Sequence, residues 1–181
     1  MQAATVNRES QKMLAKLLAK ENINVRVGNY STAFFDVERR VLGLPMWNAD
    51  NKQVSDLLVG HEVGHALYTP ADAIARFHEA LPGVPFGIGN IVEDVRIERL
   101  IKNKFPGIRR NFAVGYRELL DRDLFQLNRV NGDPNALGFL DRFNIFHKAG
   151  GLGVIRVGFT TDEQALVAAA TTTESFEDVT L

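Results

Sequence analysis

The sequence contains no cysteine, which excludes disulfide bonds and thiolate metal sites. Any metal ion would therefore be held by histidine and carboxylate side chains. Long hydrophobic runs are missing as well, because no uninterrupted apolar stretch approaches the roughly 18 residues that a membrane-spanning helix needs. The N-terminus has scattered lysines and no continuous apolar segment, so it lacks the pattern of a signal peptide. These absences predict a cytoplasmic protein without a membrane segment.

A large excess of charge is also absent, since 21 Lys and Arg residues nearly balance 22 Asp and Glu residues. The formal net charge of -1 gives no electrostatic reason to expect nucleic acid or a membrane surface as a partner. The 181 residues, 45% of them hydrophobic, suffice for one domain with a proper core. We expect a single domain over residues 1–181, with its core at about 6–122 and a helical extension at about 123–181.

The hydrophobic pattern predicts an α+β fold whose strands come early in the chain. Residues 6–20 have the spacing of an amphipathic helix, and residues 23–27 alternate as a half-buried strand. Two further strands are expected at 33–37 and 41–44, which together predict a small antiparallel sheet. The C-terminal half is predicted to be mostly helical. Its expected elements are helices at 71–80, 90–103, 109–121, 134–148 and 161–170, a turn-rich connection at 81–89 and a short strand at 154–158.

The sequence of residues 61–65 carries the strongest functional signal, because it matches the pattern H-E-x-x-H. The predicted helix around it begins after Asp50 and ends near Tyr68. His61 and His65 are four residues apart, so both imidazoles lie on one helix face and can reach one metal ion. Glu62 falls near the same face and can act as general base for a water bound to zinc.

Two glycines of the same helix, Gly60 and Gly64, reduce its propensity by roughly 1 kcal/mol each. They suggest that another backbone packs closely there, although a helix can also simply tolerate them.

A catalytic zinc site needs a third protein ligand, and a later helix offers several carboxylates. Residues 90–98 contain four ionisable groups interleaved with apolar residues, so part of this charge is expected to be buried beside a cation or a metal. Glu93 is the first choice as ligand and Asp94 the second, because neighbouring helix positions point about 100° apart. Arg96, Glu98 and whichever carboxylate is not a ligand would orient the imidazoles. Asp72 remains a third candidate of unknown direction.

Three segments together resemble the metallopeptidase-like regions that accompany von Willebrand A domains. They are Arg40 to Trp47, the His61–His65 motif, and Asn90-x-x-Glu93-Asp94-x-Arg96-Ile97-Glu98-Arg99. Such regions occur in cobaltochelatase large subunits, nitric oxide reductase activation proteins and relatives in tailed phages. The match covers roughly residues 30–125 and implies a bacterial or phage protein with a zincin fold of the glutamate-ligand (gluzincin) branch. It also implies Zn²⁺ bound by His61, His65 and Glu93, and an AAA+ ATPase as partner. The adhesion motif Asp-x-Ser-x-Ser of the chelatase type is missing from this chain.

Four other side chains have chemistry that such a site could use. Tyr68 and Tyr116 could donate to an oxyanion, although core packing is the more common role of such tyrosines. For His78 an ordinary position outside the site is favoured. His147 lies near a predicted helix end, where a positive charge would be favourable.

These observations favour a zinc metallopeptidase that hydrolyses a peptide or protein substrate. The segment 40–44 is expected to be an edge strand that pairs with the extended substrate. Two alternatives remain at this point: a zinc-binding interaction or structural module without catalysis, and a regulatory fragment of an A-domain protein that works with an AAA+ ATPase. The last residues, 175–179, resemble the start of another helix, which fits either the N-terminal part of a longer protein or a frayed tail.

Overall fold

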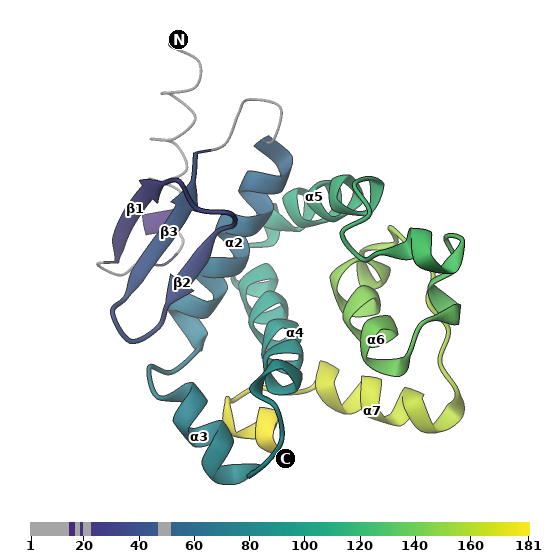
Figure 1. Cartoon of the computed structure of the whole chain (residues 1–181). Helices are drawn as coiled ribbons and strands as arrows, with labels where there is room; N and C mark the ends of the chain where they lie inside the picture. Colours follow the sequence, from purple (N-terminus) through teal and green to yellow (C-terminus); the bar gives the residue numbers. More distant parts are fainter. Residues whose placement is uncertain (1–14, 17–18, 20–22, 47–51) are drawn as a thin grey trace.

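The computed structural model describes residues 15–16, 19, 23–46 and 52–181, and in these residues the fold is α+β, as predicted. A small sheet lies beside helix α2 (Lys52–Tyr68), and five further helices follow α2 in the chain (Figure 1). Most of the predicted helix at 6–20, and residues Asp50 and Asn51 before α2, lie outside the described residues. None of the described helices is both long and apolar enough to cross a bilayer.

The sheet has three strands, and its order places the last one in the middle. β1 (Asn24–Gly28) pairs in parallel with β3 (Val41–Pro45), whereas β2 (Phe34–Asp36) pairs with β3 in the antiparallel sense. The prediction of an antiparallel sheet was therefore wrong for the β1–β3 pair. The prediction of an edge strand at 40–44 was wrong as well, because β3 is hydrogen-bonded on both sides and all five of its residues are buried.

The composition of β3 explains its central position. Val41, Leu42, Gly43 and Leu44 form a continuous apolar run, which is typical of a strand covered on both faces. Gly43 also makes room for a neighbour, because a Cβ atom there would lie 2.1 Å from the ring of Phe34 on β2. β2 is thus seated closely against β3 and forms an edge of the described sheet.

The helices lie close to the predicted positions. α3 (Ala73–Ala80), α5 (Arg109–Asp121) and α7 (Thr161–Thr171) match the predictions within two residues at each end. α4 (Phe86–Lys104) begins four residues earlier than expected, so the connection before it is shorter. α6 (Phe139–Lys148) is shorter than expected, because residues 134–136 form a 3-10 turn. The predicted strand at 154–158 is not formed.

Short 3-10 turns follow helices α4 to α7. They are η2 (Pro106–Ile108), η3 (Leu127–Val130), η4 (Pro134–Ala136), η5 (Gly150–Leu152) and η6 (Glu177–Thr180).

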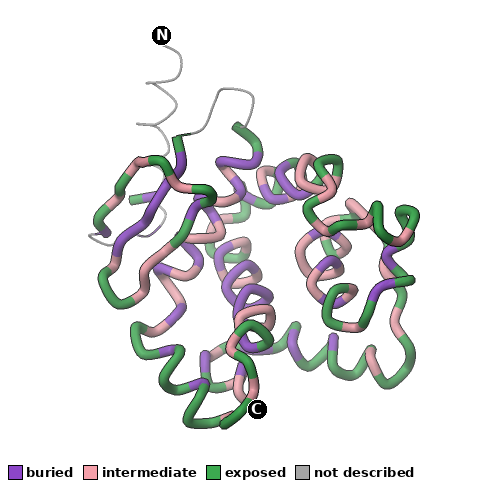
Figure 2. Tube along the Cα trace, in the orientation of Figure 1, coloured by how far each residue is buried: buried purple, intermediate pink, exposed green. Residues whose placement is uncertain are grey.

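Helix α4 connects the two halves of the described structure. It packs against α2, against α3 and η6, and against α6 and α7. Much of α4 and all of β3 are buried (Figure 2). The main apolar core joins the sheet to α2, α4 and α5, through residues that include Leu42, Leu57, Val63, Ile101 and Phe112. Two smaller clusters, around Phe77 with Phe176 and around Phe143 with Val167, attach the C-terminal half.

Candidate metal centre

His61 and His65 project from one face of α2, as their spacing predicts. Their ring centroids are 4.9 Å apart, and the side chains are each 13% exposed. A close approach between α2 and α4 (Phe86–Lys104) brings α4 to the face of α2 that carries the two histidines. A Cβ atom at Gly64 would lie 2.8 Å from the Ile97 side chain, so the glycine allows α4 to come near the histidines.

Asp94 on α4 completes a group of three candidate ligands. Its Oδ1 atom lies 3.2 Å from Nε2 of His65 and 3.6 Å from Nε2 of His61. One ligand atom from each residue lies within 4.8 Å of the other two. Tetrahedral zinc, with bonds of about 2.0–2.1 Å, separates its ligand atoms by about 3.3 Å. The three side chains therefore form a candidate metal-binding triad, in which Asp94 occupies the position that the sequence analysis gave first to Glu93.

The Glu93 carboxylate is turned away from the imidazole nitrogens and accepts three hydrogen bonds from other side chains. Its carboxylate accepts hydrogen bonds from Arg96, with Nε–Oε2 and Nη2–Oε1 distances of 2.7 Å each. Thr69 donates to Oε1 of Glu93 at 2.5 Å. Neighbouring helix residues point about 100° apart, so only one of the two carboxylates can face the imidazoles. Glu93 thus contacts the triad indirectly, through Thr69.

The second nitrogen of each imidazole is held by an oxygen. Nδ1 of His61 lies 3.0 Å from Oε1 of Glu98, and Nδ1 of His65 lies 2.9 Å from Oγ1 of Thr69. A carboxylate can only accept, so Nδ1 of His61 is the donor. Thr69 gives its own proton to Glu93, so its oxygen accepts from Nδ1 of His65. Both Nε2 atoms then face Oδ1 of Asp94, and they are the nitrogens that would bind a metal ion.

Glu98 is buried, and several groups stabilise its charge. Burial opposes ionisation, but the positive charge of Lys148 and the hydrogen bond from His61 lower the pKa of Glu98 to about 2. Tyr116 also donates its hydroxyl to Oε1 of Glu98. Burial and this carboxylate raise the pKa of Tyr116 well above its ordinary value. Tyr116 therefore supports Glu98 beneath the triad and does not face a substrate as an oxyanion donor.

Sequence reasoning missed two residues of the site, Thr69 and Lys148. Lys148, at the end of α6, places its Nζ atom 2.9 Å from Oδ2 of Asp94. Although burial alone would raise the pKa of Asp94, Lys148 and the two histidines lower it below its ordinary value. The spacing of four residues from His65 could have indicated Thr69, because it continues the same helix face. No local pattern indicates Lys148, which is 54 residues from Asp94.

Glu62 lines a pocket of about 280 Å³ together with His61 and His65. The glutamate is half-buried. The same pocket is bounded by polar groups of Thr69, Asn90 and Glu93. Its remaining walls are apolar and come from β2, the segment after β2, α3 and the start of α4: Phe34, Phe35, Val37, Ala73, Ile74 and Phe86. The two histidines of the candidate metal triad thus border a pocket that Glu62 also lines.

Four other candidates lie elsewhere. Asp72, the residue before α3, pairs with the exposed Arg76 of that helix, with an Oδ1–Nε distance of 2.8 Å. Tyr68 contributes only its carbonyl oxygen to the site, where it accepts from Arg96. His78 is exposed and contacts the rings of Phe77 and Phe86. Burial, followed by the charge of Lys102, lowers the pKa of His147 to about 4, so this residue is neutral at pH 7, contrary to the expected C-terminal charge.

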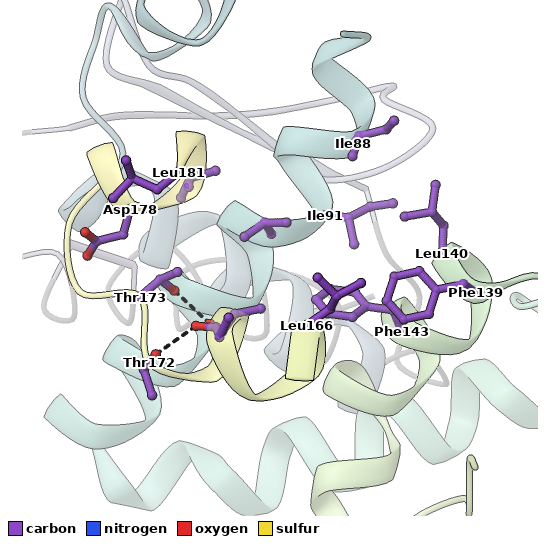
Figure 3. A pocket seen from close by; sticks show the side chains of 14 residues that line it. Ile88, Ile91, Phe139, Leu140, Phe143, Leu166, Thr172, Thr173, Asp178 and Leu181 are labelled. Carbon is purple, nitrogen blue, oxygen red and sulfur yellow. Dashed lines mark hydrogen bonds between the residues drawn. The ribbon is translucent and has the colours of Figure 1, made fainter. Parts of the chain in front are cut away.

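A larger pocket, of about 540 Å³, lies between α4, α6, α7 and the C-terminal segment (Figure 3). Its walls are mainly apolar side chains such as Ile91, Phe143 and Leu166. The hydroxyls of Thr172 and Thr173 donate to the carbonyl oxygens of Ala169 and Ala170. It contains none of the triad residues, so it does not contribute to the metal centre.

Comparison of the chain with protein-family models, curated proteins and solved structures finds no match. The function proposed below therefore rests on the geometry and chemistry of the site.

Proposed function

We propose that the protein is a zinc-dependent metallopeptidase with a zincin-like site, in which His61, His65 and Asp94 hold the metal. The observation that carries this proposal is the triad of two imidazole nitrogens and one carboxylate oxygen, whose two histidines line the same pocket as Glu62. Two nitrogens and one oxygen at these distances suit zinc, which commonly takes three protein ligands and leaves a fourth position for catalysis. The resemblance to regions found with von Willebrand A domains, the cytoplasmic location and an AAA+ partner remain predictions.

Bound zinc would supply Lewis acidity, which polarises a peptide carbonyl and makes a water molecule more acidic. Glu62 takes one proton from the attacking water as its oxygen forms a bond to the carbonyl carbon. The same side chain then passes that proton to the leaving amine as the carbon–nitrogen bond breaks. Glu98 and Thr69 keep both imidazoles oriented through these steps.

The substrate would be a peptide segment that runs along β2. β3 is the central strand and cannot bind the substrate in this way. β2 forms an edge of the described sheet and lies next to the pocket. An extended peptide can add to such an edge through main-chain hydrogen bonds. The apolar walls formed by Phe34, Ile74 and Phe86 favour an apolar substrate side chain near the cleaved bond.

The decisive experiment compares zinc content and peptide hydrolysis in four proteins. Wild type, Glu62→Gln and the control Glu79→Gln, which changes an exposed glutamate on α3, are expected to bind zinc. His61→Ala should lose it. Casein and a peptide library should be cleaved by wild type and Glu79→Gln, whereas Glu62→Gln should lose about 10²-fold or more in rate.

Equal hydrolysis by wild type and Glu62→Gln, with zinc retained in both, would rule out the peptidase mechanism. Zinc binding without any hydrolysis would favour the non-catalytic zinc module. An open pocket beside an intact glutamate argues against that alternative, because a structural zinc site is normally closed by a fourth protein ligand.

A further inference from the structure

Lys148 reaches the metal centre from the C-terminal half of the chain. It is the last residue of α6, and its side chain is only 15% exposed. The ammonium group lies 5.9 Å from the centre of the Tyr116 ring, the same tyrosine that supports Glu98. A buried ammonium group is costly unless carboxylates pair with it. The position of Lys148 is therefore fixed by the acidic groups of α4.

Of the two acidic residues near Lys148, Asp94 is the main partner. The Nζ–Oδ2 distance to Asp94 is 2.9 Å, whereas Nζ lies 3.6 Å from Oε1 of Glu98. Glu98 already accepts from His61 and Tyr116, and its other oxygen lies 3.2 Å from Nζ of Lys102. Lys148 is therefore held mainly by Oδ2 of Asp94.

The two oxygens of Asp94 have different surroundings. Oδ1 faces Nε2 of both histidines and, at 3.4 Å, the side-chain amide of Asn90. Oδ2 faces the ammonium group of Lys148. A carboxylate whose second oxygen is held by a cation is not free to rotate and present both oxygens to a metal ion. Without that cation, both oxygens could bind.

From this asymmetry we propose that Lys148 is a positioning residue that restricts Asp94 to binding the metal through Oδ1 alone. The inference rests on the proposed zinc site. One carboxylate oxygen and two imidazole nitrogens leave a fourth, open position for catalysis, whereas a two-oxygen carboxylate would raise the coordination number by one. Lys148 thereby makes the geometry of the metal site depend on α6.

The test uses Co²⁺ in place of zinc, because the visible absorption of cobalt is intense in four-coordinate sites and weaker in five-coordinate ones. Wild type, Lys148→Met, Lys148→Arg and Lys102→Met are each loaded with Co²⁺, and occupancy is measured by elemental analysis. We expect intense bands in wild type and their loss in Lys148→Met. Lys148→Arg should retain the intense bands, because a guanidinium group can also hold Oδ2 of Asp94. Lys102→Met is the matched control, since it removes the same charge beside Glu98 but does not touch Asp94.

Several outcomes would contradict the proposal. Lys148→Met with wild-type bands at full occupancy would overturn it, and so would equal loss of the bands in Lys102→Met. Should Lys148→Met fail to fold, X-ray absorption of the zinc-loaded wild type decides: four donor atoms support the proposal, and an Asp94 bound through two oxygens overturns it. Failure of the wild type to bind either metal would instead refute the zinc site itself.

Discussion

At the scale of single residues, the choice between Glu93 and Asp94 is the most informative. Both are buried carboxylates on α4, but only Asp94 lies within ligand distance of the histidines. We expect Asp94→Asn to weaken zinc binding by more than the 10–100-fold that loss of an outer partner typically costs. Glu93→Gln should stay within that range, because it acts on His65 through Thr69. Competition with a zinc chelator measures both affinities.

The two variants serve as controls for each other, because each removes one negative charge and the two positions are adjacent in the chain. A larger effect of Glu93→Gln than of Asp94→Asn would contradict the assignment of the ligand and return Glu93 to that role. Circular dichroism at equal concentration would show that both proteins are folded.

Sequence alone could place the acidic cluster of residues 93–98 at the site but could not choose the ligand. The choice depends on how α4 is rotated against α2, and a rotation of one residue, about 100°, exchanges the two carboxylates. That rotation is set by packing contacts such as Ile97 against Gly64, which no local pattern specifies. Lys148 was beyond prediction for a similar reason, because its contact with Asp94 arises only from tertiary packing.

At the scale of elements, the helix limits were more predictable than the sheet. α5 and α7 follow from hydrophobic spacing, and the Thr160–Glu163 capping box marks the start of α7. The strand order could not be predicted from the sequence, although the apolar run of β3 indicated a strand that is buried on both faces. Gly60 and Gly64 do lie at close approaches, but the nearest atoms belong to the side chains of Phe112 and Ile97 and not to a backbone.

The packing of α2 against α5 leads to a stability prediction at Gly115. A Cβ atom there would lie 2.6 Å from Cβ of Leu57 and 2.9 Å from the carbonyl oxygen of Gln53. Because neither atom is a flexible chain end, we expect Gly115→Ala to destabilise the fold by about 1–3 kcal/mol, measured by urea unfolding. Gly87→Ala in α4 is the control, since nothing lies within 4 Å of that position. It should stabilise the protein by about 0.5–1 kcal/mol. Equal stability of the two variants would show that α2 and α5 are not packed this closely.

At the scale of the whole molecule, the metal centre joins segments that are far apart in the chain. His61 and His65 come from α2, Asp94 and Glu98 from α4, and Lys148 from α6. Arg96 extends the same network, because it pairs with Glu93 and donates to the carbonyl oxygens of Tyr68 and Glu174. The C-terminal half, predicted only as a helical extension, is therefore part of the support of the site.

This arrangement predicts that zinc protects α6 from hydrogen exchange even though α6 supplies no ligand. A ligand that binds only the folded state stabilises it by about 2.7 kcal/mol at a free concentration of 100 times its Kd. If that stabilisation passes through Asp94 to Lys148, amides near the end of α6 should exchange more slowly with zinc, together with those of α2 and α4. In Lys148→Met, protection should persist in α2 and α4 but decrease at the end of α6. Protection confined to α2 and α4 in the wild type would show that α6 moves independently of the metal, and that the salt bridge to Asp94 does not couple the two halves.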